Sequence, residues 1–396
     1  MEVDMNNPPS VLFVLPWSLS AADGVSQVVI NLAREAAKRE NLRPIIFCAD
    51  PSQETFQAGE TEEIKLISGR LRAPLSSAQP GRNLATFAHK LRDELKIWRA
   101  FLEKYNVRVV NAHHPSLDYL VFALLRTRRA KIRLVFSLHG TDVTAIEKSG
   151  VAARPFARWM LKKADRIICC SEALEKRAQV SLKLDKRRLT TIHNGIDVAE
   201  LDRAKTNVYR PEVGGFDNYL VNVGSYEHRK GQDILLHAYT DLLRNGLKSA
   251  LVLIGRSKPY LQNLRGMARQ LGLQGHVFFI PDLEHSHTLS AIRHARLLVQ
   301  PSREEAFGLP LLEAGYLGTP IVAARTGGIP EVLGGYYPYL AEPDNPAALA
   351  AAIDEALFNP TDTKRQIKLM KRRVATGFTW GTAYNAYESA WSVDAG

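Results

Sequence analysis

The 396-residue chain has no long apolar run and only 3 cysteines. Its longest strongly apolar segments, such as Val11–Trp17 and Leu120–Leu125, are much shorter than the roughly 20 residues of a membrane-spanning helix. The amino terminus, MEVDMNNPPS, is acidic and polar, whereas a secretory signal would be basic and then apolar. Two of the cysteines are adjacent, a spacing that does not suggest a disulfide framework. We therefore expect a cytoplasmic protein with reduced thiols.

Several nucleotide-binding and metal-binding motifs are also missing. No G-x-G-x-x-G follows an expected strand and no G-x-x-x-x-G-K-[ST] occurs, which argues against dinucleotide and ATP sites of those kinds. No D-x-D-like acidic pair lies beside a candidate site, and the His285–His287 pair lacks the spacing of metal ligands. The sequence therefore predicts neither a bound metal nor a cofactor.

Acidic residues are too few to balance the basic ones, and the net charge of +11 lies almost entirely in residues 1–205. Such a field can attract nucleic acid, an anionic membrane surface or an acidic small molecule. The densest basic cluster spans Arg126–Arg133, but no recognised nucleic-acid-binding module accompanies it. We therefore expect no nucleic-acid partner.

What the sequence does contain is a regular alternation of short apolar runs with longer segments of helical period. This rhythm is typical of parallel sheets with helices on both faces, and the chain is long enough for two such domains. The strands are expected at Val11–Trp17, Pro44–Asp50, Val107–His114, Ile132–His139, Arg166–Ser171, Leu189–His193, Tyr219–Val223, Ala250–Ile254, His276–Ile280, Arg296–Gln300 and Pro320–Ala323. Helices are expected at Gly24–Lys38 and Leu84–Tyr105. The sequence therefore predicts an α/β protein of two doubly wound units.

The domain boundary is expected in the aperiodic stretch around residues 200–217, which contains Pro211, Gly214 and Gly215. We accordingly predict domains at residues 1–205 and 206–377, followed by an aromatic-rich terminal helix at 378–396. In open parallel sheets, ligands bind beyond the carboxyl ends of the strands. The residues that directly follow each strand are therefore the candidate site residues.

The most informative segment is Gln300–Ala324, QPSREEAFGLPLLEAGYLGTPIVAA, in which a strand leads through a loop into a helix near Gly308. The free amides of Gly308 and Leu309, together with the helix dipole, would form an anion site that suits phosphate. Glu313 on the helix can accept two hydrogen bonds from a ribose diol, and Glu305 in the loop can accept from the hydroxyls of a sugar. The segment therefore predicts a site for a nucleotide-sugar.

Two cations follow another expected strand, in the loop Gly224–Gly231, GSYEHRKG. Arg229 and Lys230 can neutralise a diphosphate leaving group. The loop therefore predicts a second wall of the same phosphate site.

Polar side chains also follow strands in the first half of the chain. His139 ends one expected strand within the loop SLHGTD, and His113 and His114 end the strand before it. We expect His114 and Asp142 to contact an acceptor, for which His113 is a further candidate. Gly24 would let the backbone approach the diphosphate or the acceptor closely.

These segments resemble, in the same order, the motifs of the retaining GT-B glycosyltransferases called family 4. Gln300–Ala324 resembles the E-x7-E signature of that family, and Ala324–Leu333, ARTGGIPEVL, is similar to its continuation. Further matches cover nearly the whole chain, at Asp23–Val25, Ser137–Asp142, Ala164–Ser171, Ile192–Asp197, Gly224–Gly231 and Phe378–Trp380. Several matches in the correct order make a chance resemblance improbable.

The resemblance implies a fold and a division of labour. In a GT-B fold, two Rossmann-like domains face each other across a cleft, and the terminal helix returns to the N-terminal domain. By this resemblance residues 1–205 would bind the acceptor and residues 206–377 the nucleotide-sugar.

The resemblance also implies roles for single residues. Glu305 would hold the donor sugar, Glu313 the ribose and Lys230 the phosphates, while His139 would lie near the sugar and its β-phosphate. The remaining donor-binding residues would be Gly24, Ser225, Phe307, Gly308 and Leu309. Many family members have an arginine where this chain has Ser225, and we expect Arg229 to supply the missing guanidinium.

The implied reaction moves a sugar from a UDP- or GDP-sugar to an acceptor hydroxyl with retention at the anomeric carbon, without a metal. The acceptor could be a glycan, a lipid-linked glycan or a small metabolite, and cell-envelope or exopolysaccharide synthesis is the commonest family role. The alternative is a noncatalytic relative that binds a nucleotide-sugar or a glycan.

Peripheral members of the family rest on the cytoplasmic membrane face. The stretch Arg154–Arg166 interleaves basic residues with Phe156, Trp159, Met160 and Leu161, as interfacial helices do. We expect the basic half either to recruit an anionic acceptor or to contact an anionic membrane in this way. An internal helix with a basic outer face would fit the same pattern.

Overall fold

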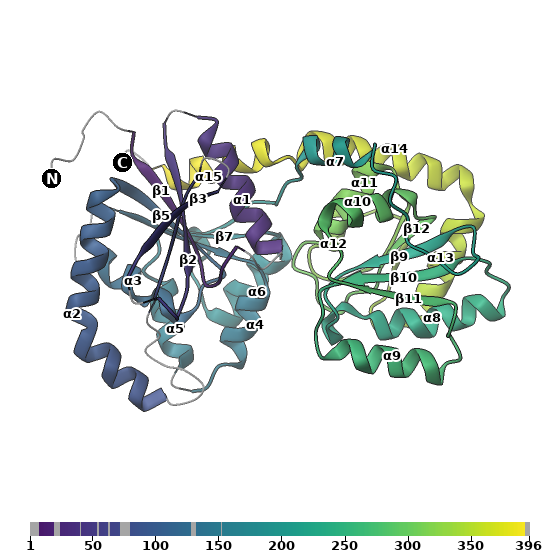
Figure 1. Ribbon diagram of the computed structural model, residues 1–396, viewed down its shortest axis with the longest axis horizontal. Coiled ribbons are helices and arrows are strands. Elements are labelled where there is room, and N and C mark those ends of the chain that lie inside the picture. Colours follow the sequence, from purple (N-terminus) through teal and green to yellow (C-terminus); the bar gives the residue numbers. More distant parts are fainter. Residues whose placement is uncertain are drawn as a thin grey trace. The chain divides into compact units, whose positions relative to one another are not determined.

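The computed structural model describes residues 8–19, 24–39, 41–53, 55–61, 64–71, 80–127, 132–151 and 153–392. These residues form two compact units (Figure 1). One unit holds the chain up to His193 and again from Trp380, and the other unit is Asn194–Thr379. The compact units meet at residue 193, whereas the predicted domain boundary is at residue 205; helix α7 (Val198–Ala204), which lies between these positions, packs on two helices of the second unit. No described helix combines the length and the apolar character that crossing a bilayer requires.

The first unit is built on an eight-stranded sheet with the order β3-β4-β2-β1-β5-β6-β7-β8. Neighbouring strands are parallel except for β3, which pairs antiparallel with β4. The strands are β1 (Ser10–Leu15), β2 (Arg43–Ala49), β3 (Gln57–Thr61), β4 (Ile64–Gly69), β5 (Val107–His113), β6 (Arg133–Leu138), β7 (Arg166–Cys169) and β8 (Leu189–Thr191). Since β5 and β6 are parallel neighbours, the residues that follow them lie at one edge of the sheet.

Helices cover both faces of this sheet. They are α1 (Gly24–Ala37), α2 (Pro80–Lys104), α3 (Leu120–Thr127), α4 (Thr141–Lys148), α5 (Ala153–Leu161), α6 (Glu172–Leu182) and α15 (Trp380–Trp391), with short 3-10 turns η1 (Leu117–Tyr119) and η2 (Lys186–Arg188). The apolar sides of α1 and α15 share one core with the sheet. On the other face, Trp98 of α2 packs edge-on against Phe47 of β2 and Phe122 of α3.

The second unit has a six-stranded, wholly parallel sheet with the order β11-β10-β9-β12-β13-β14. Its strands are β9 (Tyr219–Val223), β10 (Ala250–Gly255), β11 (Val277–Pro281), β12 (Leu297–Gln300), β13 (Ile321–Ala324) and β14 (Leu340–Ala341). Its helices are α7, η3 (His228–Lys230), α8 (Gln232–Arg244), α9 (Tyr260–Gln270), α10 (His285–His294), α11 (Leu309–Leu317), α12 (Ile329–Leu333), α13 (Pro346–Phe358) and α14 (Pro360–Gly377). The predicted architecture of two doubly wound Rossmann-like units is therefore confirmed.

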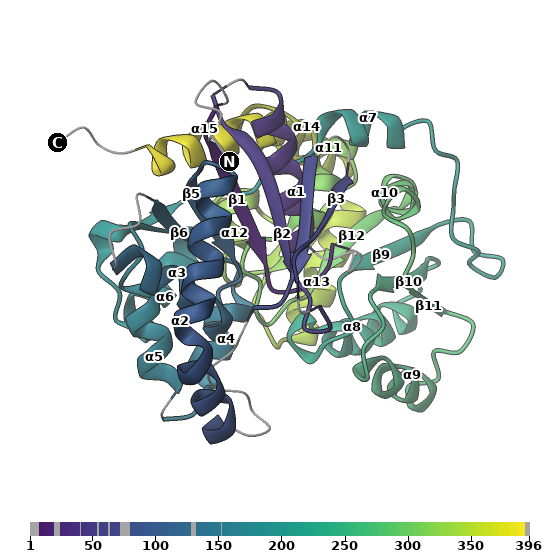
Figure 2. The same cartoon turned by 60° about the vertical axis from the view of Figure 1, so that its left-hand side comes forward.

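The terminal helix α15 belongs to the first unit, far from its neighbours in sequence. Figure 2 shows it beside α1, with which it is in contact. Trp391 is buried against Phe13 of β1, and its indole Nε1 donates to Asn111 Oδ1 at 2.9 Å. Arg39 and Glu388 add an ion pair at 3.0 Å. The aromatic side of α15 therefore packs in the same core as a sheet whose strands come from the first half of the chain.

Candidate active site

In the second unit, two loops lie side by side because the strands that they follow are neighbours. Strand β9 leads into Gly224–Gly231, and β12 leads into the loop that carries Glu305. The connection is tight: a Cβ on Gly231, whose φ is +67°, would lie 2.0 Å from the carbonyl oxygen of Pro301. Glycine is therefore required at this position for the two loops to touch.

The centre of this site is an ion pair between Lys230 and Glu305. Lys230 Nζ lies 2.7 Å from Glu305 Oε2, and the two side chains are only 12% and 9% exposed. The same oxygen accepts from Ser302 Oγ at 3.0 Å and from Gln300 Nε2 at 3.3 Å. The stem of Lys230 lies over Gly224. The structure thus brings together a cation and a carboxylate that are 75 positions apart in sequence.

The charges of this pair stabilise each other in a poorly solvated place. Burial by itself would raise the pKa of the Glu305 carboxyl, but the Lys230 ammonium, the Arg229 charge and the Ser302 hydroxyl together hold that pKa below its usual value. Glu305 is therefore ionised near neutral pH. It can accept hydrogen bonds from sugar hydroxyls, while Lys230 presents a positive charge suited to phosphate.

A second buried ion pair, which the sequence did not single out, holds the two loops together. The guanidinium of Arg303 makes two hydrogen bonds of 2.7 Å to the carboxylate of Asp233 at the start of α8. A third bond of 2.8 Å reaches the carbonyl of His228. Arg303 holds the pKa of Asp233 below its usual value, although burial opposes this. Arg303 lies inside the quoted motif, but nothing in its spacing distinguishes it from a solvated charge.

The first turn of α11 was predicted to bind phosphate. Gly308 caps the helix with φ +103°, and no side chain caps the amides of the first turn. Pro310 has no amide hydrogen and Leu311 N donates to the Gly308 carbonyl at 3.0 Å, so the amides that could bind an anion are those of Gly308 and Leu309. Phe307 is 3% exposed and its ring packs on Phe378 at 6.0 Å between centroids. The ring therefore belongs to the core, and the contribution of Phe307 to a donor site would come from its backbone.

The other predicted donor residues in the GSYEHRKG loop, Arg229 and Ser225, make hydrogen bonds to residues close to them in sequence. Arg229 Nε donates to Glu227 Oε2 at 2.6 Å, so its guanidinium is shared with a neighbouring carboxylate. The carbonyl of Ser225 accepts from Gln232 Nε2 at 3.2 Å. Roles for Arg229 and Ser225 in donor binding stay predictions.

Glu313 on α11 has a hydrogen-bond partner, His285, that the sequence did not indicate. Its Oε1 is 3.1 Å from His285 Nε2, and the other ring nitrogen of His285 is 2.9 Å from Glu200 Oε1. The sequence had shown only that His285 lacks metal-ligand spacing. Its pairing could not be found there, since the partners are 28 and 85 positions away.

In the first unit, His139 and His113 follow and end the neighbouring strands β6 and β5. His113 Nδ1 lies 3.1 Å from His139 Nε2, and the two rings stack at 5.3 Å between centroids. Burial lowers the pKa of His113 to about 3. Burial, followed by the neighbouring His113 and His114, lowers the pKa of His139 well below its usual value. Both rings are therefore neutral at pH 7, and one donates a hydrogen bond to the other.

The two predicted acceptor residues, His114 and Asp142, have different surroundings. His114 has a left-handed backbone with φ +53°, and its Nε2 lies 2.9 Å from Thr141 Oγ1. Its ring packs edge-on against Trp17 at 4.9 Å between centroids. Such a backbone conformation in a residue other than glycine is common at binding sites. A contact of His114 with the acceptor stays a prediction.

Asp142, the other predicted acceptor residue, is bound by its own turn. It is 1% exposed, and its carboxylate accepts backbone hydrogen bonds from His139, Gly140 and Val143 at 2.8–2.9 Å. These bonds stabilise the turn after β6 and fix the backbone of His139, and a contact of Asp142 with the acceptor stays a prediction. Gly24, by contrast, is exposed at the first residue of α1, as a position of close backbone approach would be.

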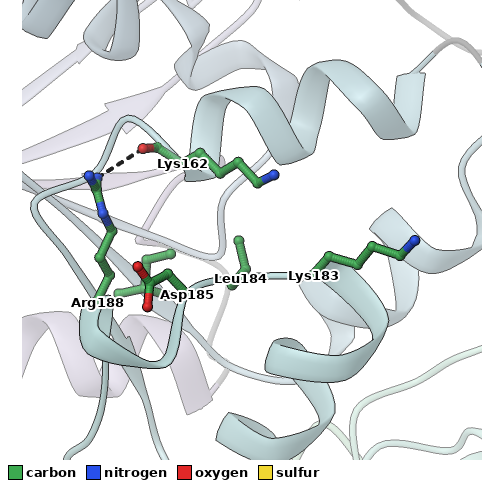
Figure 3. Close-up of a pocket in the computed structure, with 6 residues that line it drawn as sticks. Lys162, Lys183, Leu184, Asp185 and Arg188 are labelled. Atoms are coloured by element: carbon green, nitrogen blue, oxygen red, sulfur yellow. Dashed lines mark hydrogen bonds between the residues drawn. The ribbon is translucent and has the colours of Figure 1, made fainter.

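A pocket of about 380 Å³ lies elsewhere in the first unit and contains none of these residues (Figure 3). It is lined by Lys162, Ile167, Lys183, Leu184, Asp185 and Arg188. Ile167 is near the amino end of β7, the edge opposite to the one where ligands of parallel sheets bind. Arg188 is turned to the carbonyls of Lys162 and Ala164. We therefore do not assign the active site to this pocket.

The fold and the site together define a class of protein. Two Rossmann-like units, of which one presents a buried lysine, a carboxylate and an open helix terminus, are what a nucleotide-sugar-dependent transferase of the GT-B fold contains. Comparison with known proteins agrees. The model of "Glycosyltransferase Family 4" matches residues 22–200, and the model of "Glycosyl transferases group 1" matches residues 210–373.

The chain belongs to this glycosyltransferase family, and it is therefore a retaining glycosyltransferase that uses a nucleotide-sugar. D-inositol 3-phosphate glycosyltransferase 1 of Catenulispora acidiphila is 30% identical over 297 residues, which are 69% of each chain. Glycogen synthase of Mycobacterium tuberculosis H37Rv is 29% identical over 288 residues, 70% of this chain and 67% of that protein. The structure of HepE from Anabaena in complex with UDP and glucose is 18% identical, covers 96% of this chain and 98% of its own, and superposes with a TM-score of 0.72.

Proposed function

We propose that this enzyme transfers a sugar from a UDP- or GDP-sugar to a hydroxyl of an anionic or lipid-linked acceptor in cell-envelope or exopolysaccharide synthesis. The observation that carries the donor part is the Lys230–Glu305 pair, of which Glu305 lies in the loop that leads into the open first turn of α11. A related protein that is named for D-inositol 3-phosphate, together with the basic first half of this chain, supports an anionic acceptor.

We infer the following chemistry for these residues. The bond between the anomeric carbon and the phosphate oxygen breaks, and the acceptor oxygen forms its bond on the same face of the sugar. The acceptor proton passes to the departing phosphate. Lys230 and the amides of Gly308 and Leu309 stabilise the negative charge that develops on the diphosphate. Glu305 orients the sugar, and neutral His139 donates to the donor without adding a charge.

A donor screen tests this proposal. Purified protein is heated with UDP, GDP and ADP, each in the presence and absence of EDTA. We expect one diphosphate to raise the melting temperature, since a ligand that prefers the native state stabilises it. We also expect EDTA to change neither this stabilisation nor the turnover of a nucleotide-sugar. The reason is that cations of the protein stabilise the charge of the diphosphate, as a metal would otherwise do. No stabilisation by any diphosphate would contradict the donor assignment, and loss of turnover in EDTA would contradict the metal-independent mechanism.

A second part of the proposal concerns the membrane. The α5 surface, defined as Val151, Phe156, Trp159, Val180, Lys162, Lys163 and Lys183, combines exposed apolar side chains with cations. Arg154 and Arg158 of α5 both donate to the carbonyl of Ser181, which places α5 beside the end of α6. Lys162 and Lys183 extend to the same side of the pocket in Figure 3. Met160 and Leu161, which were also expected at the interface, are fully buried. We propose that the remaining surface contacts anionic lipid.

Liposome sedimentation tests the α5 surface. We expect the protein to sediment with vesicles that contain phosphatidylglycerol and to stay in the supernatant with pure phosphatidylcholine. The double variant Phe156→Ser/Trp159→Ser should lose this binding. A matched control is Phe358→Ser, which changes a phenylalanine that is 80% exposed on the second unit. Equal recovery of wild type from both kinds of vesicle would end the membrane proposal.

A further inference from the structure

His285 is held between two carboxylates that come from different helices. Its Nδ1 lies 2.9 Å from Oε1 of Glu200 on α7, and its Nε2 lies 3.1 Å from Oε1 of Glu313 on α11. The Glu313 side chain is 14% exposed, and His285 itself is 38% exposed. A residue that the sequence did not assign to the donor site therefore touches the glutamate expected to bind the ribose.

The helices α7, α10 and α11 are packed together around this contact. Tyr316 of α11 adds a second link, since its hydroxyl donates to Asp202 of α7 at 2.9 Å. The neighbouring titratable groups on α10 are engaged elsewhere: Glu284 accepts from Ser286, and His287 stacks on Tyr209. Strand β9, which also packs on α10, presents Tyr219 to a carbonyl of that helix. The charged groups that face the His285 ring are thus Glu200 and Glu313.

The two carboxylates determine the charge of the ring. Burial lowers the pKa of His285, but the hydrogen bonds and charges of Glu200 and Glu313 outweigh burial and raise this pKa to about 10. At neutral pH the ring is therefore an imidazolium, and both nitrogens donate charge-assisted hydrogen bonds. A carboxylate in such a bond is fixed in orientation.

We propose that His285 is a positioning residue of the donor site, which holds the Glu313 carboxylate in one orientation with Oε2 left for a ribose hydroxyl. Glu200 holds His285 in turn and would not touch the donor. This inference rests on the proposed function, because it requires that Glu313 binds the ribose of a nucleotide-sugar. It adds that binding of the ribose depends on a residue outside the motif that contains Glu313.

Binding of nucleoside diphosphates with and without ribose hydroxyls tests the inference. Calorimetric affinities are measured for whichever of UDP, GDP and ADP binds wild type best, and for its 2′,3′-dideoxy analogue. We expect His285→Ala to weaken the natural diphosphate about tenfold and to leave the dideoxy analogue within twofold of wild type. His285→Gln, which keeps a neutral donor, should recover part of the loss. Glu200→Gln should act in the same direction as His285→Ala but more weakly. The matched control is His287→Ala on the same helix, which should bind like wild type.

Three outcomes would overturn either the inference or the proposed function. Unchanged affinity of His285→Ala for the natural diphosphate would overturn the inference while the proposed function stands. An equal loss for the natural and the dideoxy compound would also overturn it, because a general distortion does not discriminate ribose hydroxyls. Failure of wild type to bind any of the three diphosphates would overturn the proposed function itself.

A titration of the protein without ligand gives a readout that does not depend on the donor. The pKa of His285 in the folded state lies above its ordinary value of 6.5. Its contribution to the unfolding free energy is therefore complete below about pH 6.5 and is lost as the pH rises toward about 10. We expect the difference in melting temperature between wild type and His285→Gln to shrink over this range. A His285 resonance that titrates near pH 6.5 in the NMR spectrum would contradict the imidazolium.

Discussion

Replacing Lys230 with alanine is expected to lower kcat at least tenfold, which corresponds to about 1.4 kcal/mol in the activation barrier. The ammonium is the cation closest to Glu305 and is shielded from water, so its charge acts on a phosphate with little screening. Removal of Glu305 by Glu305→Ala should have an effect at least as large, because it also leaves the Lys230 charge buried and unpaired. Steady-state turnover of the donor identified in the thermal screen is the measurement.

The stability of the single and double variants separates the effect on chemistry from the effect on folding. Breaking a buried pair by removing one partner costs about 3–5 kcal/mol, so the melting temperature of each single variant should fall. The double variant Lys230→Met/Glu305→Gln removes both charges and should regain part of the melting temperature without regaining turnover. Lys248→Ala, which changes an exposed lysine before β10, is the control and should match wild type. Wild-type turnover in folded Lys230→Ala and Glu305→Ala would remove the site assignment.

Gly327→Ala is expected to reduce turnover about a hundredfold, although residue 327 would carry only a methyl group. An added Cβ would lie 1.9 Å from the carbonyl oxygen of Glu305, and φ is +50° at this position. The obstacle is backbone, so no side-chain rotation relieves it, and the 3.0 Å hydrogen bond from Gly328 N to the same carbonyl would be disturbed. Displacing a site residue by about 1 Å can cost a hundredfold in rate.

The control for this variant is eight residues away. Gly335→Ala adds the same methyl group where nothing lies within 4 Å. We expect it to keep the turnover and the melting temperature of wild type. Crystal structures of both variants would show Glu305 displaced from Lys230 in the first and unmoved in the second. Equal turnover in the two variants would mean that the close approach of Gly327 does not position Glu305.

The sheets were largely predictable because each buried parallel strand is a short apolar run. All eleven expected strands are present within about two residues of the expected ends, and helices α1 and α2 lie where their periodicity placed them. Strand β3, QAGET, was missed because it is an exposed edge strand with few apolar residues, and its neighbour β4, Ile64–Gly69, was missed as well. Strand β14 has two residues and no pattern of its own. The contacts that join α7 to the second unit were not predictable, because they have no local signature in the sequence.

The candidate site was predictable where chemistry follows a strand and not where it depends on pairing. Lys230 and Glu305 were found because both come directly after neighbouring strands. The turn contacts of Asp142 were not predictable, since an acidic residue after a strand looks the same in sequence whether it faces a ligand or binds its own turn. Arg303 with Asp233, and His285 with Glu200, are separated by 70 and 85 positions. Only the folded chain shows that these charges meet.

The chain forms the second unit before it returns to the first, and this order has a consequence for folding during translation. The first unit requires Trp380–Trp391, which a ribosome makes only after the whole second unit, a continuous stretch from Asn194 to Thr379. Until α15 emerges, the apolar surface that Trp391 and Tyr384 will cover stays open. The unit that is synthesised first is therefore the one that completes its folding last, and a premature stop codon near residue 379 would harm the opposite end of the gene product.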